Sequence, residues 1–368
     1  MVEHKHKITS ERLISLDAFR GFTMFLLIGE FTGLFSFLND PTFKNSIVGF
    51  ISTQLHHHQW NGLHFWDLVQ PYFMFIVGVA IPFSERNRLK KGSTDFEVFK
   101  HALIRSALLL FLGWALYCIG PGRITFRFQN VLAQLSVTYL VAFLIRNKSI
   151  TLQLVISLLI LALVEIIYRT FPVVGFTQPF VPDLNFGAYV DMFISGELSS
   201  GHWVSFNAIP TIAHTVWGVI IGKIFLSGKT KNEILKVMVF TGVIGVIIGY
   251  ALDPLTPIIK RISTSSFVFV SGGWSIITFA FFYWIIDMKG YKTWAKFAII
   301  VGMNPLFIYL FAHVGGGEII ANIIKPFTFG LFGWTGELYT NIITSLFVWY
   351  LLWYITYWFY KRKIFIKI

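Results

Sequence analysis

Long apolar stretches separated by short polar ones form the main pattern along this chain. A helix of about 20 mostly apolar residues can cross the hydrocarbon core of a bilayer. Stretches of this kind lie at about 16–38, 65–84, 102–120, 128–145, 149–168, 207–227, 234–252, 267–287, 297–314 and 341–360. The pattern therefore predicts an all-α polytopic membrane protein with about ten transmembrane helices in a single domain, 1–368.

Two segments outside the simple pattern are of interest. Residues 170–206 form a long connection without Lys or Arg, and they carry Asp183, Asn185, Asp191, Glu197, His202 and Trp203. Long connections are often functional, so we predict a lid or an acceptor platform here, with a merely variable loop as the alternative. Residues 314–339 contain three consecutive glycines and Pro326. They predict a re-entrant or interfacial segment, which is stable only where protein or water covers its backbone.

The composition agrees with a membrane location. Of 368 residues, 55% are hydrophobic and 13% are charged, which is too apolar for a soluble domain of this length. A net charge of +12 would suggest nucleic acid binding in a soluble protein, but most Lys and Arg here fall in loops on the side of the N-terminus. Positive loops mark the cytoplasmic side. We therefore predict cytoplasmic termini and a multi-pass protein of the inner membrane, with the lipid bilayer and no nucleic acid as its partner.

A cluster of histidines lies at the start of the second apolar stretch. His56, His57, His58 and His64 precede an apolar run that begins at Phe65. Histidine can take and return a proton near neutral pH, so such a cluster suits general base chemistry. A solvated loop, or adventitious metal binding, is the alternative that composition alone leaves open.

Other ionisable residues lie inside the apolar stretches or at their ends. Glu30, Asp67, His214 and His313 all fall toward the predicted outer side. A charge at the centre of a membrane helix costs about 2.5 to 3.5 kcal/mol, so these residues are candidates for function. Each of them could instead cap a helix or pair with a neighbour.

Basic residues gather at the predicted inner side. Arg20 follows Asp17 by one helical turn, so the two side chains can pair along the helix. Alternatively, Arg12, Arg20 and Arg105, with the basic loop at 86–91, could bind phosphates, because the guanidinium group makes paired contacts with them. Topology and lipid contact are the other roles open to the loop residues.

Two single residues complete the candidates. Asn304 precedes the helix-breaking Pro305, where its amide could contact a ligand or satisfy backbone groups that the proline frees. Cys118 is the only cysteine and lies in an apolar run, so we predict a packing role for it. No metal site is predicted.

Five motifs, in order, resemble those of a known family. They are Arg12-Leu13-x-Ser15-Leu16-Asp17-x-Phe19-Arg20-Gly21; His57-x-x-Trp60-Asn61-Gly62, followed by Asp67-Leu68, Pro71, Gly78 and Pro82; Ile209-Pro210-Thr211-Ile212-Ala213 with Gly218 and Gly222; Ser266-Phe267-Val268 before Gly273-Trp274; and Gly302-Met303-Asn304-Pro305-Leu306. Over nearly the whole chain this order resembles the heparan-alpha-glucosaminide N-acetyltransferase family of the transmembrane acyltransferase superfamily, in its bacterial form.

The resemblance implies an N- or O-acyltransferase that uses cytosolic acetyl-CoA, or another short acyl-CoA, as donor. The acceptor would be an amino sugar or other saccharide at the outer face. His57 would be the general base, with Asp67 and Glu30 as further catalytic residues. Glu30 stands ten residues after Arg20, whereas the family spacing is eleven, a register that Phe31 occupies. With such an enzyme as the expectation, we predict that Arg12, Arg20, Arg105 and Asn304 bind the coenzyme. Trp60, Asn61, His214 and His313 are the predicted acceptor-binding residues.

The same resemblance suggests a homodimer. Trp349, Trp353 and Trp358 are a candidate contact, but they also suit an aromatic belt that faces lipid. A function of another class stays open: a proton-coupled transporter of small molecules or glycans, with the intramembrane His and Glu residues as proton relay. The sequence shows no inverted repeat, which favours the enzyme.

Overall fold

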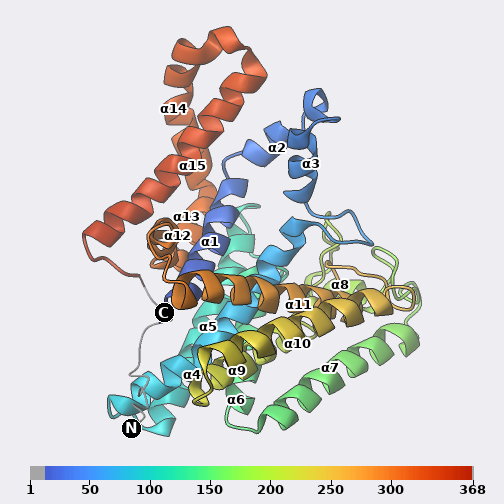
Figure 1. The fold of residues 1–368 in the computed structure, drawn as a ribbon. Coiled ribbons are helices and arrows are strands. Elements are labelled where there is room, and N and C mark those ends of the chain that lie inside the picture. Colours follow the sequence, from blue (N-terminus) through green and yellow to red (C-terminus); the bar gives the residue numbers. More distant parts are fainter. Residues whose placement is uncertain (1–12, 367–368) are drawn as a thin grey trace, which may run out of the picture.

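The computed structural model describes residues 13–366, and these residues form helices with no strand among them (Figure 1). The α-helices are α1 (Ile14–Glu30), α2 (Leu34–Leu38), α3 (Ile47–Gln54), α4 (Val69–Lys90), α5 (Asp95–Ile119), α6 (Val131–Ile145), α7 (Ile150–Thr170), α8 (Phe186–Ser195), α9 (Ile212–Leu226), α10 (Lys231–Leu252), α11 (Ser265–Phe282), α12 (Ala295–Gly302), α13 (Pro305–Phe311), α14 (Gly317–Phe332) and α15 (Glu337–Lys361). Short 3-10 turns, η2 (Phe65–Leu68) and η3 (Ser205–Ala208), lead into α4 and α9. The all-α prediction is confirmed for the described residues.

Eight helical segments within residues 13–366 are long and apolar enough to cross a membrane. They are Phe65–Lys90, Asp95–Ile119, Ile150–Thr170, Ser205–Leu226, Lys231–Leu252, Ser265–Met288, Pro305–Thr335 and Glu337–Lys361. Every predicted window contains helix, but α1 and α6 have only 17 and 15 residues. The window 297–314 is broken, because Pro305 begins a new helix. The fold thus supports an integral multi-pass protein, while the count of ten and the cytoplasmic termini stay predictions.

The segment 314–339 is helical. α13 passes into α14 through a kink at Gly315, whose φ of +93° lies in the region that favours glycine. α14 packs against α15, where Thr328 Oγ1 lies 2.7 Å from Thr344 Oγ1. The two helices form the hairpin at the top of Figure 1. The re-entrant or interfacial placement of this segment stays a prediction.

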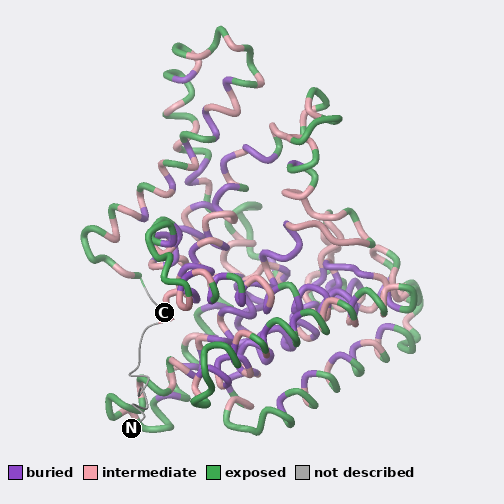
Figure 2. Tube along the Cα trace, viewed as in Figure 1, coloured by how far each residue is buried: buried purple, intermediate pink, exposed green. Residues whose placement is uncertain are grey.

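A buried centre is formed by α4, α9 and α11, whereas few residues of α5, α7 and α10 are buried (Figure 2). Glycines allow α4 and α9 to approach closely. A Cβ at Gly78 would collide with the carbonyl of Thr215, and one at Gly218 with the carbonyl of Phe75. Small residues at helix contacts are typical of membrane proteins, where close backbone approach drives association. The exposed apolar faces of the outer helices suit contact with lipid.

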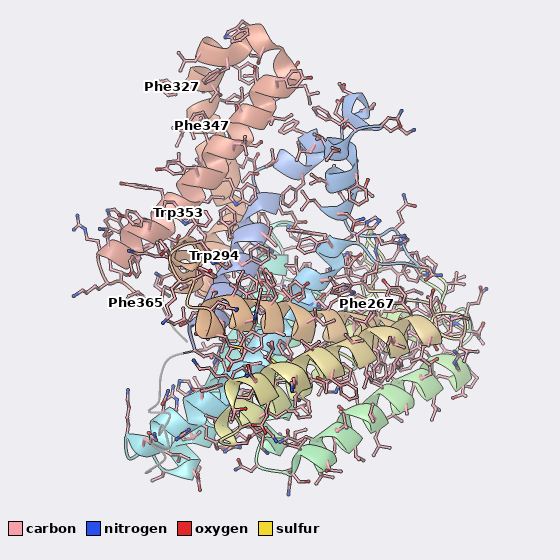
Figure 3. All side chains as sticks on the ribbon, in the orientation of Figure 1. Phe267, Trp294, Phe327, Phe347, Trp353 and Phe365 are labelled. Atoms are coloured by element: carbon pink, nitrogen blue, oxygen red, sulfur yellow. The ribbon has the colours of Figure 1, made fainter. Side chains whose placement is uncertain are left out.

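The predicted tryptophan stripe of α15 is largely used within the chain. Trp349 Nε1 donates to the carbonyl of Phe25 at 3.0 Å, and Trp353 Nε1 donates to that of Phe297 at 3.1 Å. Trp358 is 44% exposed. Figure 3 shows Trp353 on α15, with Phe347 and Phe327 farther out on the α14–α15 hairpin. A homodimer through this surface stays a prediction.

The long connection 170–206 folds onto the helices and contains α8. Asp191 of α8 is buried. It accepts hydrogen bonds from the Ser205 backbone N–H at 3.1 Å and from Gln129 Nε2 at 3.2 Å. These contacts fix α8 to η3 and to the residues that precede α6.

Candidate functional site

The loop between α3 and η2, residues 55–64, carries the four clustered histidines. Its backbone pairs with the loop between α10 and α11: the Gly62 N–H donates to the carbonyl of Ile258 at 2.8 Å, and Asn61 forms an isolated bridge with Ile259. This pairing places Lys260 beside His57, although the two are 203 residues apart.

His57 and Asp67 are in direct contact. His57 Nδ1 lies 2.8 Å from Asp67 Oδ1. Asp67 Oδ2 accepts from the backbone N–H groups of His58 at 3.2 Å and His64 at 2.8 Å. The Asp67 side chain is 1% exposed, so three hydrogen bonds and its surroundings fix the carboxylate. When Nδ1–H donates to this carboxylate, Nε2 keeps its lone pair, which is the form in which histidine accepts a proton.

Lys260 is the counterion of this pair. Its Nζ lies 3.1 Å from His57 Nδ1 and 3.8 Å from Asp67 Oδ1. Since Nδ1 cannot both donate to Asp67 and accept from an ammonium, we assign its proton to the shorter contact. Burial, and then the Lys260 charge, lower the pKa of His57 to about 4 against the opposing effect of Asp67. Burial lowers the pKa of Lys260 to about 8. His57 is therefore neutral at pH 7, as a base must be before it takes a proton.

Trp203, from the end of the long connection, lies against this cluster. Its ring centre is 5.1 Å from that of His57, in an edge-to-face arrangement. The Lys260 ammonium lies 5.4 Å and the Arg261 guanidinium 5.5 Å from the Trp203 ring centre. We call His57, Asp67, Lys260 and Trp203 the His57 site. The predicted lid thus has a residue in contact with the predicted base.

Glu30, the last residue of α1, lies near the same site. It is within electrostatic range of Lys260 and His56, and it interacts with the Trp66 side chain. Glu30 is exposed. At the neighbouring register, the Phe31 ring packs 4.4 Å from the His313 ring. Between the two candidates, Glu30 is the one close to Lys260.

Two of the predicted acceptor residues lie in the histidine loop. Trp60 Nε1 donates to the carbonyl of Phe180 at 2.7 Å, and the Trp60 ring lies 6.1 Å from the His202 ring. Asn61 is exposed. Trp60 therefore joins the histidine loop to the long connection, and the acceptor role of both residues stays a prediction.

The other two predicted acceptor residues, His214 and His313, have different surroundings. His214 is fully buried between α9 and α11, with Nε2 2.9 Å from Ser271 Oγ. It has no exposed surface and joins the two helices, and its acceptor role stays a prediction. His313 Nδ1 lies 3.0 Å from the carbonyl oxygen of Tyr309, within the kink that follows α13.

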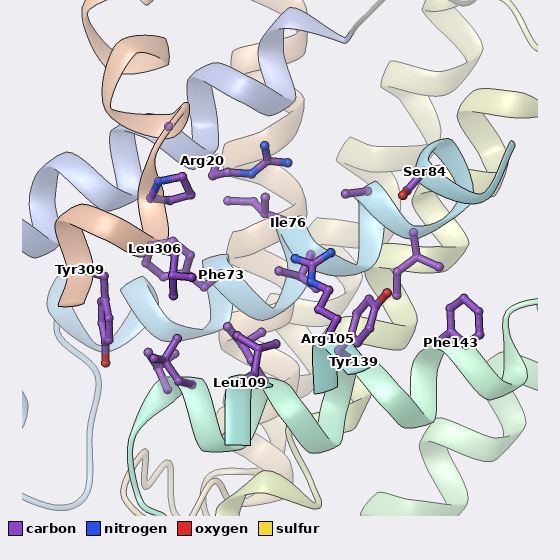
Figure 4. A pocket seen from close by; sticks show the side chains of 18 of the residues that line it. Arg20, Phe73, Ile76, Ser84, Arg105, Leu109, Tyr139, Phe143, Leu306 and Tyr309 are labelled. Carbon is purple, nitrogen blue, oxygen red and sulfur yellow. The ribbon is translucent and has the colours of Figure 1, made fainter. Parts of the chain in front are cut away.

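A cavity of about 400 Å³ extends along the other end of α4, between α4, α5, α6 and the residues around α13 (Figure 4). Its wall includes three arginines, Arg20, Arg88 and Arg105, and it continues along apolar side chains to Phe73 and Tyr309. We call it the basic cavity. The structure thus brings together Arg20 and Arg105, two residues predicted to bind a coenzyme.

The Arg105 guanidinium in the basic cavity retains binding capacity. The Arg105 guanidinium lies 4.8 Å from the Tyr139 ring centre, and its buried Nε has no hydrogen bond partner among the described residues. Arg88 Nη2 lies 2.7 Å from His101 Nε2. Arg20 pairs with Asp17 at 3.3 Å, the ion pair that the sequence predicted. A buried donor without a partner favours an anion beside it.

Asn304 contributes to this cavity through the C-terminal segment. Its Nδ2 donates to the carbonyl of Ile364 at 2.9 Å, and its Oδ1 accepts from the Ile366 N–H at 2.8 Å. Ile366 lines the cavity. The amide therefore holds the C-terminal segment in place, and direct contact between Asn304 and a coenzyme stays a prediction. Arg12, also predicted to bind the coenzyme, lies outside the described residues.

Sequence reasoning missed Lys260 and Arg261 as site residues. It counted both only as charges of an outer loop. A signal was present, because these two form the only adjacent basic pair in the loops assigned to the outer side, where positive charge is scarce. Their place beside Trp203 and His57 depends on the pairing of two distant loops, which hydropathy does not reveal.

These features define a multi-pass helical membrane protein that carries a histidine–aspartate site and a basic cavity at opposite ends of one central helix. No family model matches the chain. It is 26% identical to the heparan-alpha-glucosaminide N-acetyltransferase of Homo sapiens. The alignment is 423 positions long and covers 97% of this chain and 60% of that protein. It is 24% identical to the protein of the same name from Mus musculus, over 98% of this chain and 61% of the relative. The similarity supports a relation at the level of the family, and the chain spans about three fifths of the length of these relatives.

Proposed function

We propose that this chain is a transmembrane acyltransferase, in which an acyl-CoA bound at the basic cavity donates its acetyl or short acyl group to an acceptor at the His57 site. The observation that carries the proposal is the position of the His57 site at one end of α4 and of the arginines of the basic cavity at the other. The chain from Asp67 to Arg88 corresponds to about 30 Å of helix, similar to the thickness of the hydrocarbon core. The acyl group crosses while the charged carrier stays on its own side.

The basic cavity has the chemistry that a coenzyme A thioester needs. Its arginines suit the phosphates, since guanidinium binds them in paired, charge-assisted contacts. Its apolar wall, with Val77, Leu109 and Phe73, suits the thin arm that carries the thioester. The wall ends at Phe73 and Tyr309, about 9 Å of helix short of Asp67. The acyl group passes these side chains to reach His57.

His57 acts as the base. Its Nε2 takes the proton of the acceptor amine or hydroxyl while that atom bonds to the thioester carbonyl carbon. The carbonyl becomes an oxyanion, which then re-forms the double bond as the carbon–sulfur bond breaks. The leaving thiolate takes up a proton and departs as free coenzyme A. Asp67 stabilises the imidazolium and keeps its ring in place, as the aspartate of a catalytic triad does.

A saccharide is the acceptor that the His57 site suits best. Trp203 and Trp60 offer aromatic surface at the contact between the long connection and the histidine loop. The relatives are named for an N-acetyl transfer to a glucosaminide, which makes an amino sugar the first candidate. Amine and hydroxyl acceptors use the same base, so both N- and O-transfer are compatible with this geometry.

Removal of an arginine from the basic cavity tests donor binding. We expect Arg105→Gln and Arg20→Gln each to raise KM for acetyl-CoA about 10-fold or more, because a hydrogen bond to a charged group contributes about 1.5 to 3 kcal/mol. The kcat should change less, since neither residue lies at the His57 site. The measurement is steady-state acetyl transfer by the purified protein in detergent.

Arg86→Gln is the matched control. Arg86 is an exposed arginine at the same end of α4 and is not part of the cavity wall. The KM of Arg86→Gln for acetyl-CoA should stay within about 2-fold of that of the unchanged protein. Equal KM values for Arg86→Gln and Arg105→Gln would place the donor elsewhere.

A further inference from the structure

Gln70 lies on α4 between the two sites. The wall residues of α4 recur at helical spacing, with Phe73, Val77, Ile81, Ser84 and Arg88 on one stripe. Gln70 continues that stripe by one turn toward Asp67. It is half-buried, whereas the residues on both sides of it, from Trp66 to Val69 and from Pro71 to Ile76, are buried. Part of the Gln70 side chain is therefore accessible, one turn from the carboxylate that holds His57.

A chain of buried amides fixes the Gln70 side chain. Gln70 Nε2 donates to Gln134 Oε1. Gln134 Nε2 in turn donates to Asn207 Oδ1, and Asn207 Nδ2 donates to the backbone carbonyl of Arg261 at 3.3 Å. Gln134 and Asn207 are 1% and 0% exposed. The chain thus joins Gln70 to the loop that carries Lys260.

The Gln70 amide has one hydrogen bond donor that is not used within the described residues. Its nitrogen carries two hydrogens, of which one goes to Gln134, and no second hydrogen bond of this amide is found within the described part of the chain. The hydrogen bond to Gln134, which is itself buried and held by Asn207, keeps the Gln70 amide in place. A donor held in place on α4 between the cavity and the base is suited to stabilising a negative charge that develops on the substrate.

We propose that Gln70 is a catalytic residue that donates a hydrogen bond to the carbonyl oxygen of the acyl group as transfer proceeds. The assignment rests on the proposed function. When the acceptor atom bonds to the carbonyl carbon, the electron pair of the C=O bond moves to oxygen, and Gln70 Nε2–H stabilises that oxyanion. The pair returns when the carbon–sulfur bond breaks, and Gln70 itself is unchanged. Gln134 and Asn207 are positioning residues, because they act through Gln70.

The test compares Gln70→Met, which keeps the length of the side chain, with Gln70→Glu, which keeps its shape and has no N–H donor when ionised. Both should lower kcat about 100-fold, the effect of losing one such donor. Free coenzyme A lacks the acyl carbonyl, so its Kd should stay within about 2-fold. Gln54→Met is the control. Gln54 accepts a hydrogen bond from the Phe65 N–H near Asp67, and its loss should change kcat less than 3-fold.

Three results would overturn the assignment. One is a kcat for Gln70→Met within 3-fold of the unchanged protein. Another is a loss of affinity for free coenzyme A as large as the loss of kcat/KM, because the amide would then bind the arm and not the oxyanion. The third is full activity of Gln70→Glu. Absence of acyl transfer by the unchanged protein is a separate outcome, which overturns the proposed function itself.

Discussion

His57→Ala is expected to lower kcat for acyl transfer about 1,000-fold, within the range that a positioned base contributes. The reason is the geometry of the ring. Nδ1 contacts Asp67 at 2.8 Å, and Nε2 is left to accept the proton of the acceptor. Without the imidazole, an amine or hydroxyl must attack while it still holds its proton. The affinity for acetyl-CoA should not change, because the basic cavity lies at the other end of α4.

The neighbouring histidines provide matched controls. His56 Nδ1 contacts the carbonyl oxygen of Ser52 at 2.8 Å, and the His58 ring packs 4.8 Å from that of His64. His56→Ala and His58→Ala should therefore retain kcat within about 5-fold. A His57→Ala protein as active as these two would show that another group acts as the base.

Asp67→Asn is expected to lower kcat about 1,000-fold while leaving the side chain volume almost unchanged. The carboxylate accepts from His57 Nδ1 and from two backbone N–H groups. An amide offers only one acceptor oxygen, so either the histidine loop or the imidazole loses its partner. The loss of the Nδ1–H contact lets the other tautomer form, in which Nε2 carries the proton and cannot act as a base.

Asp183→Asn is the control for this change. Asp183 Oδ2 lies 2.7 Å from His202 Nδ1, an aspartate–histidine pair of the same kind in the long connection, and both of its side chains are about one third exposed. We expect the kcat of Asp183→Asn to stay within about 3-fold of that of the unchanged protein. Equal losses in the two variants would mean that Asp67 has no special role.

Stability must be measured with activity for Asp67→Asn. Lys260 is 6% exposed, and the substitution leaves its ammonium without the Asp67 carboxylate. The double variant Asp67→Asn with Lys260→Met should recover part of any loss in Tm, since it removes the buried charge. It should not recover kcat. A recovery of both would show that the single variant lost activity through unfolding.

The helices were predictable from the sequence because lipid requires long apolar runs, and each predicted window contains a helix. The boundaries of the helices were less predictable than their presence. α1 and α6, with 17 and 15 residues, are shorter than the windows predicted for them, and three glycines made the segment 314–339 look irregular. The helix signal was nevertheless present in α14, where Ile319, Ile323, Phe327 and Leu331 recur every fourth residue along an exposed stripe. The glycines mark a kink between two helices.

The candidate site was predictable where its residues are close in sequence. His57 and Asp67 stand ten residues apart and are in contact. Lys260 and Trp203 reach them through pairing of distant loops, which no local pattern encodes. His214 was predicted to bind the acceptor because of its depth in an apolar stretch; it is buried beside Ser271, and the acceptor role stays a prediction. A polar side chain deep in an apolar stretch needs a hydrogen bond partner, and α11 supplies Ser271 to His214.

The central claim is that the acyl group crosses the membrane while its carrier does not. Vesicles that contain the protein and enclose an impermeant amino sugar oligosaccharide would be given acetyl-labelled coenzyme A on the outside only. We predict labelled acceptor inside those vesicles whose basic cavity faces outward, with all coenzyme A still outside, and no label with His57→Ala. Labelling only when donor and acceptor share one compartment would contradict the account.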